Sequence, residues 1–189
     1  MSGYLANPLV FLIHALLGFY VAIVALRFLL QWVRADFYNP MSQFIVRVTT
    51  PVLRPLRRFI PGYGGLDLSA LVLAWLVKAV ELAAVTLVAG LGNPLGALFW
   101  AIPALVTLFI NIFLFAILIR VILSWVNPDP YNPAVTLLER LTDPLLRPAQ
   151  RLIPTVAGLD LSPMAAMIAL VVLEMLLVPP LNLLTGSPF

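Results

Sequence analysis

Three charged residues lie deep inside apolar stretches of the chain. Lys78 and Glu81 are three positions apart, and Glu174 stands in a separate apolar stretch. A charge in the middle of a membrane costs at least about 2.5 to 3.5 kcal/mol, so such a side chain should face the interior of a helix bundle, paired or protonated. Ionisable groups at that depth are the ones that transport proteins use to bind or relay ions. Lys78, Glu81 and Glu174 are therefore our candidate intramembrane polar site.

The two glutamates occupy equivalent places. Each comes 12 residues after a serine, Ser69 or Ser162, which places it about 18 Å along its helix and close to the middle of a membrane. We expect Glu81 and Glu174 to meet between the two halves of the protein, with Lys78 neutralising one of them. The alternative is that these residues make interhelical polar contacts, worth about 0.6 to 2 kcal/mol each, and bind no ion.

Other chemistry has little support in the sequence. The chain has one histidine and no cysteine, so no pair of histidines or thiolates is present to hold a metal, and we interpret His14 and Asn111 as polar contacts. The GxSxG, HExxH and phosphate-binding glycine motifs are missing. The basic loops lack the interleaved aromatic residues typical of nucleic-acid binding. We expect no enzyme activity, no cofactor, no metal and no nucleic-acid partner.

The elements that position these residues are membrane-spanning helices. The chain has 189 residues, of which 62% are hydrophobic and 10% charged, with a mean hydropathy of +1.07, and a soluble domain is not built this way. A helix needs about 20 apolar residues to cross a membrane. Four stretches meet this length, at about 8–32, 69–91, 99–126 and 162–184. The sequence predicts an all-α membrane protein with four transmembrane helices.

The chain is a duplication. A shift of 93 positions aligns residues 27–69 with residues 120–162 without a gap, and 22 of these 43 positions are identical. Residues 1–96 form the first repeat, with the loop 33–68 between its spans, and residues 97–189 form the second, with the loop 127–161. Because each repeat contains two spans, the second copy enters the membrane from the same side as the first. The repeats are two tandem, parallel helix hairpins.

Arginines are concentrated in the two loops, and the opposite side carries no lysine or arginine. By the positive-inside rule, both loops are cytoplasmic and both termini lie on the other side of a bacterial inner membrane. The loop arginines are candidates for contacts with anionic lipid headgroups or with a partner: Arg47, Arg54, Arg57, Arg58, Arg140, Arg147 and Arg151.

The loops should contain amphipathic helices. Asn39-Pro40 and Asn132-Pro133 each combine an N-cap residue with a proline suited to the first helical position. In the first loop an apolar face follows, and a second short segment is expected after Pro51, kinked or restarted at Pro55. These helices either lie in the membrane interface, with arginines on lipid phosphates, or pack on the four-helix core; both readings stay open.

Asp67 and Asp160 end the loops. Each begins the turn before the next span, where a carboxylate suits the exposed NH groups of a helix N-terminus. Capping is the simpler expectation. The alternative pairs each aspartate with the arginine near the end of the preceding span, Arg27 or Arg120, and so holds each loop against its hairpin.

The residues repeated in order resemble the YggT family of integral membrane proteins, also called YlmG-like: Arg27, Trp32, Asn39, Pro40 and Asp67, then Arg120, Trp125, Asn132, Pro133 and Asp160, within two copies of a pattern that ends in GLDLS. The second copy departs from the first at Gln150, which replaces Arg57. The resemblance implies a role in osmotic stress tolerance, in potassium or proton balance, or in assembly of membrane complexes. It carries no catalytic residues.

Two functions follow as hypotheses. The first is a non-enzymatic inner-membrane scaffold or assembly factor that affects ion homeostasis or envelope processes and engages membrane lipids, a membrane-protein partner or further copies of itself. The second is a potassium or proton channel or transporter subunit that uses Lys78, Glu81 and Glu174.

Overall fold

The computed structural model describes residues 3–91, 93–126, 129, 131–153 and 160–188. Its four longest apolar helical stretches are each long enough to cross a membrane, at Ala6–Trp32, Leu68–Ala89, Pro94–Val126 and Ser162–Thr185. The four predicted spans are confirmed within a few residues at each end. Two of the four, α4 (Leu68–Ala89) and α7 (Ser162–Thr185), are single α-helices.

The other two spans carry a local irregularity. The first consists of α1 (Gly3–Ile13), the π-helical turn η1 (His14–Gly18) and α2 (Phe19–Trp32). The third begins with the 3₁₀ turn η2 (Pro94–Gly96) and continues as α5 (Ala97–Val126). A π-helical turn takes in an extra residue and so rotates the helix faces on its two sides relative to one another. The face of α1 is therefore offset from that of α2.

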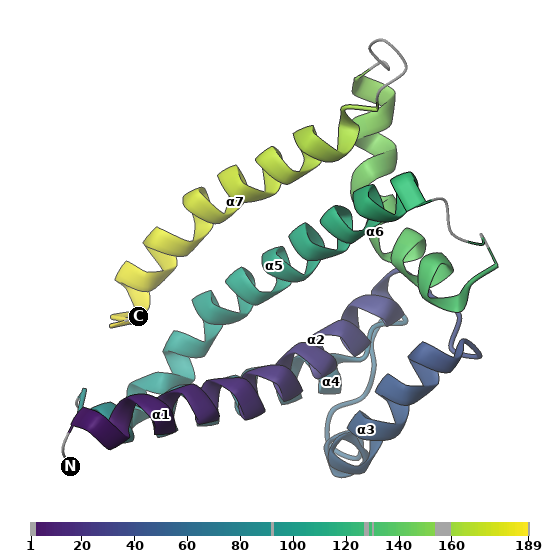
Figure 1. Ribbon diagram of the computed structural model, residues 1–189. Coiled ribbons are helices and arrows are strands. Elements are labelled where there is room, and N and C mark those ends of the chain that lie inside the picture. The colour runs from purple at the N-terminus through teal and green to yellow at the C-terminus, as the bar shows by residue number, and fades with distance from the viewer. Residues whose placement is uncertain (1–2, 92, 127–128, 130, 154–159, 189) are drawn as a thin grey trace.

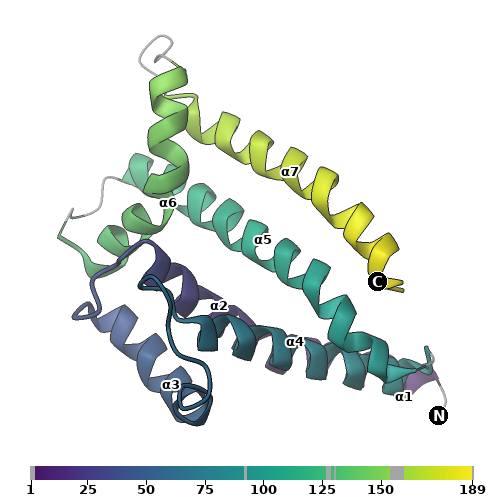
Figure 2. The same cartoon turned by 180° about the vertical axis from the view of Figure 1, so that it is seen from behind.

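The two loops lie at the same end of the molecule. The loop helices α3 (Pro40–Leu56) and α6 (Pro133–Leu152) gather at one end of the spans, and both termini lie at the other (Figure 1). The view from behind gives the same arrangement (Figure 2). This is the geometry that two parallel hairpins predict.

The repeats meet where α4 packs on α5. Close to the turn between them, Ala79 and Leu82 of α4 are buried against Ala97, Trp100 and Ala101 of α5. Deeper in the bundle, Leu105 of α5 packs against buried residues of both α2 and α4. Small residues at such a contact allow two helix backbones to approach closely. The fourth span, α7, packs on α5 and α6.

Both loop helices begin at the predicted asparagine. The Asn39 side chain accepts a hydrogen bond from the Met41 N–H at 2.9 Å, and Asn132 accepts one from Ala134 at 2.9 Å. The following proline occupies the first turn in each case. Asn39 also donates from Nδ2 to the Pro133 carbonyl at 2.6 Å, so the two helix starts are joined.

The expectation of two short segments in the first loop is wrong, because α3 continues through both Pro51 and Pro55. A proline removes one backbone hydrogen bond and strains the preceding turn. The buried face of α3, formed by Ser42, Ile45, Thr49 and Leu53, runs across the Pro51 position without interruption. Packing of that face supports the helix where its backbone bonding is weakened. The helix α6 likewise contains Pro144 and Pro148, and it changes direction along its length (Figure 1).

The sequence left two places for the apolar face of α3, the four-helix core or the membrane interface, and the structure shows some of it buried and some exposed. Leu53 is fully buried in the core with α2, α4 and α5, and Ile45 is buried against the end of α2. Phe44 and Phe59 remain exposed, at 57% and 84%. One side of the loop segment therefore packs on the bundle, and its exposed aromatic residues remain available to a membrane surface.

Candidate functional site

A buried arginine fastens the first loop helix to the first span. Arg27 lies on α2, is 4% exposed, and donates from Nη1 to the hydroxyls of Thr49 and Thr50, at 2.5 and 3.1 Å, and to the Val46 carbonyl at 3.2 Å. These three acceptors lie on one turn of α3, immediately before Pro51. We call this set of contacts the arginine anchor. It gives one end of a buried guanidinium its hydrogen bonds, which reduces the cost of burying the charge, while Nε has no partner among the described residues.

The second repeat contains the same anchor. Arg120 of α5 donates from Nη1 to the Thr142 hydroxyl at 2.6 Å and to the Glu139 carbonyl at 3.4 Å. At the position equivalent to Thr50 the second repeat has Asp143, which forms an ion pair with Arg120 at 2.9 Å. Asp143 also pairs with Arg147 at 2.6 Å. The second anchor is therefore partly neutralised by a carboxylate, whereas the first uses neutral acceptors.

Each loop is closed by an aspartate at its far end. Asp67 caps α4 by accepting from the Ala70 N–H at 3.3 Å, and it forms an ion pair with Arg57. Capping is confirmed for Asp67, and its partner is Arg57 of the loop rather than Arg27. The equivalent Asp160 accepts from the Ser162 N–H at 2.9 Å and from the Gln150 side chain at 3.0 Å. Gly158 and Leu159, which precede Asp160 in the second GLDLS, lie outside the described residues.

The environment of both aspartates stabilises the ionised form. Burial alone would raise the pKa of Asp67, but hydrogen bonds from Arg57 and Ser69 and the charge of Arg57 bring that pKa below its ordinary value. Hydrogen bonding to Ser162 is the main cause that lowers the pKa of Asp160, and Gln150 contributes to the same shift. Both carboxylates are charged at neutral pH and act as fixed closures of their loops.

The loop arginines point outward. All seven candidates are exposed. Two of them are engaged within the chain, Arg57 with Asp67 and Arg147 with Asp143. Among the residues that the structure describes, the others have no hydrogen-bond or ion-pair partner: Arg47, Arg54, Arg58, Arg140 and Arg151.

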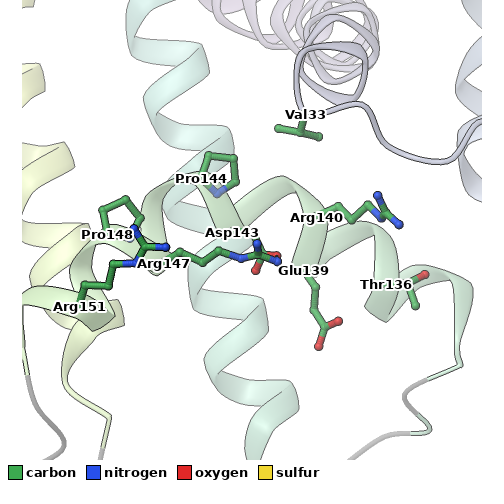
Figure 3. Close-up of a pocket in the computed structure, with 9 residues that line it drawn as sticks. All are labelled: Val33, Thr136, Glu139, Arg140, Asp143, Pro144, Arg147, Pro148 and Arg151. Carbon is green, nitrogen blue, oxygen red and sulfur yellow. The ribbon is translucent and has the colours of Figure 1, made fainter.

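A basic groove runs along α6. It has a volume of about 710 Å³ and is lined by Arg140, Arg147 and Arg151, with Asp143 and Glu139 among the other lining residues. Figure 3 shows Arg140 and Arg151 on either side of the Arg147–Asp143 pair. The three arginines are spaced at i, i+7 and i+11, which places them on one helix face. Guanidinium groups in such a row suit the phosphate oxygens of an anion.

A smaller groove of about 510 Å³ lies in the first repeat and overlaps in part with the place equivalent to the groove on α6. Arg47, which corresponds to Arg140, lines it together with Arg27 and Arg57. Each repeat therefore presents a basic groove beside its own arginine anchor.

A second polar cluster lies within the spans. The Glu81 carboxylate is 1% exposed, and its Oε1 accepts from Lys78 Nζ at 2.8 Å and from His14 Nδ1 at 2.7 Å. Its other oxygen, Oε2, has no hydrogen-bond partner among the described residues. The side chain of His14 is 44% exposed and opens the cluster to the surface of the bundle. His14 is thus an interhelical polar contact, as predicted, and it joins Lys78 and Glu81 in one site.

His14 was not among the predicted members of this site. It lies 67 positions from Glu81 and at the start of the π-helical turn η1. The sequence indicated only that a buried carboxylate such as Glu81 needs a polar partner, without indicating which one. Which helix supplies that partner depends on packing and on the phase shift of the first span.

Glu174 does not join this cluster. It is half-buried on α7 and has no hydrogen bond or ion pair with any described residue. In both views α5 lies between α4 and α7 (Figures 1 and 2). The expectation that Glu81 and Glu174 meet is therefore wrong, because α5 packs between α4 and α7 and separates the helices that carry them.

The tryptophans at the ends of the first and third spans differ in environment. Trp32 packs edge-on against Phe113, with ring centroids 6.2 Å apart, whereas Trp125 is 85% exposed. Both mark the end of the spans that carries the loop helices.

Comparison with known proteins finds one family. The model of the CCB3/YggT family matches residues 6–88 and again residues 99–181, two segments related by the same shift of 93 positions as the internal duplication. No solved structure matches the chain.

Curated relatives span most of this chain. An uncharacterized protein of Pseudomonas aeruginosa is 48% identical over 182 residues, covering 95% of this chain and 92% of its own length. The uncharacterized protein YggT of Escherichia coli K12 is 37% identical over 174 residues, covering 89% and 88%. The uncharacterized protein ycf19 of Guillardia theta is 38% identical over 63 residues, which is 33% of this chain and 69% of that protein.

Proposed function

The chain belongs to the CCB3/YggT family, and from that premise we propose that it is a non-enzymatic scaffold of the bacterial inner membrane that displays two basic helices to anionic lipid headgroups. Its loops face the cytoplasm and its termini the opposite side. Its bearing on osmotic or ion homeostasis is indirect, through the membrane components that it holds in place.

The observation that carries this proposal is the repeated arginine anchor. Arg27 and Arg120 hold α3 and α6 against the ends of the spans through threonine hydroxyls at equivalent positions. A helix fixed in this way keeps its basic face at a constant height relative to the membrane. Pre-organised groups bind with less loss of conformational entropy than mobile ones.

The free arginines supply the binding energy. Arg140 and Arg151 line the groove on α6 without partners among the described residues, and Arg47 lines the smaller groove of the first repeat. Each basic residue close to an anionic membrane surface contributes about 1 kcal/mol. Phe44 and Phe59 of the first loop are exposed and suit insertion at the headgroup level.

The test is lipid retention by the purified protein in nanodiscs that contain phosphatidylglycerol and phosphatidylcholine. We expect the Arg140→Gln, Arg151→Gln double variant to retain less phosphatidylglycerol than wild type, with phosphatidylcholine unchanged. Arg34→Gln is the matched control, because Arg34 is exposed but does not line either groove. Equal retention by the double variant and wild type contradicts the lipid role.

The scaffold role has a separate test. Affinity capture from gently solubilised membranes should return a stoichiometric membrane-protein partner or further copies of the chain. Capture of neither, with lipid retention intact, leaves a lipid-binding protein without a scaffold function.

A second candidate function rests on the Glu81 cluster. A buried carboxylate with one free oxygen, an amine at 2.8 Å and a half-exposed histidine at 2.7 Å is a group that can take up and release a proton or a cation. The corresponding measurement is potassium and proton flux into liposomes, wild type beside the Glu81→Gln variant, with Glu174→Gln as the control because Glu174 lies outside the cluster. Flux that disappears in the Glu81→Gln variant supports transport, and absence of flux in wild type rejects it.

A further inference from the structure

The contact between the repeats is built from matching surfaces. On α4, Ala79 and Leu82 are each 4% exposed, because Ala97, Trp100 and Ala101 of α5 cover them. Further into the bundle, Leu105 of α5 belongs to one buried cluster with residues of α2 and α4, among them Val21 and Ala74. The second span of one repeat and the first span of the next thus form the internal junction.

The same positions one repeat later lie on an outer face. A shift of 93 residues carries Ala79 and Leu82 to Val172 and Met175 of α7, which are 47% and 69% exposed. The second repeat therefore presents the α4 side of the junction on a face that no other described helix covers as α5 covers α4.

The other side of the junction is also uncovered, at the opposite edge of the molecule. The shift carries Ala101, Ala104 and Leu105 of α5 back to Pro8, Phe11 and Leu12 of α1. In α5 these residues are buried or half-buried, whereas in α1 all three are exposed, Phe11 at 70% and Leu12 at 50%. The first span thus offers the surface that α5 uses against α4.

The space that Leu105 fills in the first repeat is a groove in the second. The groove lies between α5 and α7, has a volume of about 440 Å³, and includes Leu114 and Met167 in its lining. These two residues are the counterparts of Val21 and Ala74. By the repeat relationship, the side chain that corresponds to Leu105 at this groove is Leu12 of another copy.

Burial along the spans agrees with this pattern. In their most apolar segments the inner helices α4 and α5 have 39% and 33% of their residues buried, against 17% in the first span and 11% in α7. Lipid tails can cover an outer helix, since they are as apolar as leucine, so exposure alone does not require a partner. Both sides of the α4–α5 contact, however, recur one repeat away as exposed faces, on α7 and on α1.

We propose that the protein assembles head to tail with itself in the membrane, the α5–α7 face of one copy receiving α1 of the next in the manner of the α4–α5 junction. The interface is heterologous, so each copy uses two different faces, and assembly gives a ring if the rotation closes and a row if it does not. The proposal uses only the spans and does not depend on lipid binding by the loops.

Cysteine cross-linking tests this directly, because the chain contains no cysteine. Two differently tagged copies are co-expressed, each with a single cysteine, and oxidised in intact membranes with copper phenanthroline. Leu12→Cys should form a mixed disulfide with Met167→Cys, and Pro8→Cys one with Val172→Cys. Since each copy has one cysteine, a mixed disulfide joins two molecules.

The matched control is Leu173→Cys, adjacent to Val172 and at nearly the same depth. Its counterpart in the first repeat is Val80, which is 59% exposed and therefore outside the internal junction. We expect Pro8→Cys to cross-link with position 172 and not with position 173. No mixed disulfide at either expected pair, or equal cross-linking at 172 and 173, overturns the proposal. Disulfides between like positions, 12 with 12 or 167 with 167, also overturn it, because they indicate a symmetric contact.

Discussion

Arg27 and Arg120 lie 93 positions apart and make the same contact, each donating from Nη1 to a threonine hydroxyl of its loop helix, Thr49 at 2.5 Å and Thr142 at 2.6 Å. The residue after each threonine differs. In the first repeat Thr50 adds a hydroxyl, and in the second Asp143 adds a carboxylate. The geometry of the anchor is common to both repeats, while its net charge is not, so the two should respond differently to substitution.

Thr49→Val should destabilise the protein by about 1 to 3 kcal/mol, because Arg27 is deeply buried and loses an acceptor of a charged hydrogen bond. Thr142→Val should cost less, since Arg120 keeps the Asp143 carboxylate at 2.9 Å. Unfolding in mixed detergent measures both losses, and hydrogen exchange should show faster exchange confined to α3 in the first variant. Equal losses in the two variants would contradict the anchor described here.

Asp67 should make stability depend on acid pH. Its pKa is lower in the folded protein than the ordinary value of about 3.9. Its stabilising contribution is therefore complete well above pH 4 and is lost as the pH falls through the folded pKa. We expect the stability difference between wild type and Asp67→Asn to be largest near neutral pH and to shrink below about pH 4. A difference that stays constant from pH 7 to pH 3 argues against a charged Asp67 in the folded state.

Lys78 and Glu81 should behave as a coupled pair. Removing one partner of a buried pair costs about 3 to 5 kcal/mol when the other charge is left without compensation. Loss of Glu81 leaves Lys78 in that position, whereas loss of Lys78 leaves Glu81 its contact with His14 at 2.7 Å. The Lys78→Met, Glu81→Met double variant should therefore lose less stability than the sum of the two single variants. Glu174→Gln serves as the control, because Glu174 contacts neither residue, and its effect should simply add to that of either single variant. Additive losses at positions 78 and 81 would show that the two residues are independent.

Asn39 should matter more than its counterpart Asn132. Both cap a loop helix, which is worth about 1 kcal/mol, but only Asn39 also donates to the Pro133 carbonyl, at 2.6 Å. Asn39→Asp keeps an oxygen for the cap and removes the donor, so it isolates the link between the two loops. We expect this variant to widen the distribution of distances between spin labels on α3 and α6, while Asn132→Asp leaves it unchanged. Identical distributions would mean that the link does not hold the loops together.

Much of the fold follows from local rules that the sequence displays. The spans are long apolar runs, and the starts of both loop helices are set by asparagine followed by proline, which acts within one turn. Asp67 caps its helix for the same local reason. The duplication could be read directly, because polar and proline positions recur at a constant spacing.

What could not be read depends on packing between distant segments. The continuity of α3 through Pro51 and Pro55 rests on burial of Thr49 and Leu53, which proline content alone does not reveal. The partner of Glu81 is supplied by the first span, after a π-helical turn that no residue pattern announced. The separation of Glu81 from Glu174 follows from the order in which the hairpins pack.

The location of both chain ends at the same end of the bundle has a consequence for how such proteins grow (Figure 1). A hairpin crosses the membrane twice, so a gene fusion that adds one returns the chain to the side from which it started. Every existing loop keeps its orientation. The first helix of the added hairpin packs on the last helix of the old one, in the way that α5 packs on α4. A chain with one such hairpin and a chain with two can therefore be related by a duplication that leaves the topology of the first hairpin unchanged.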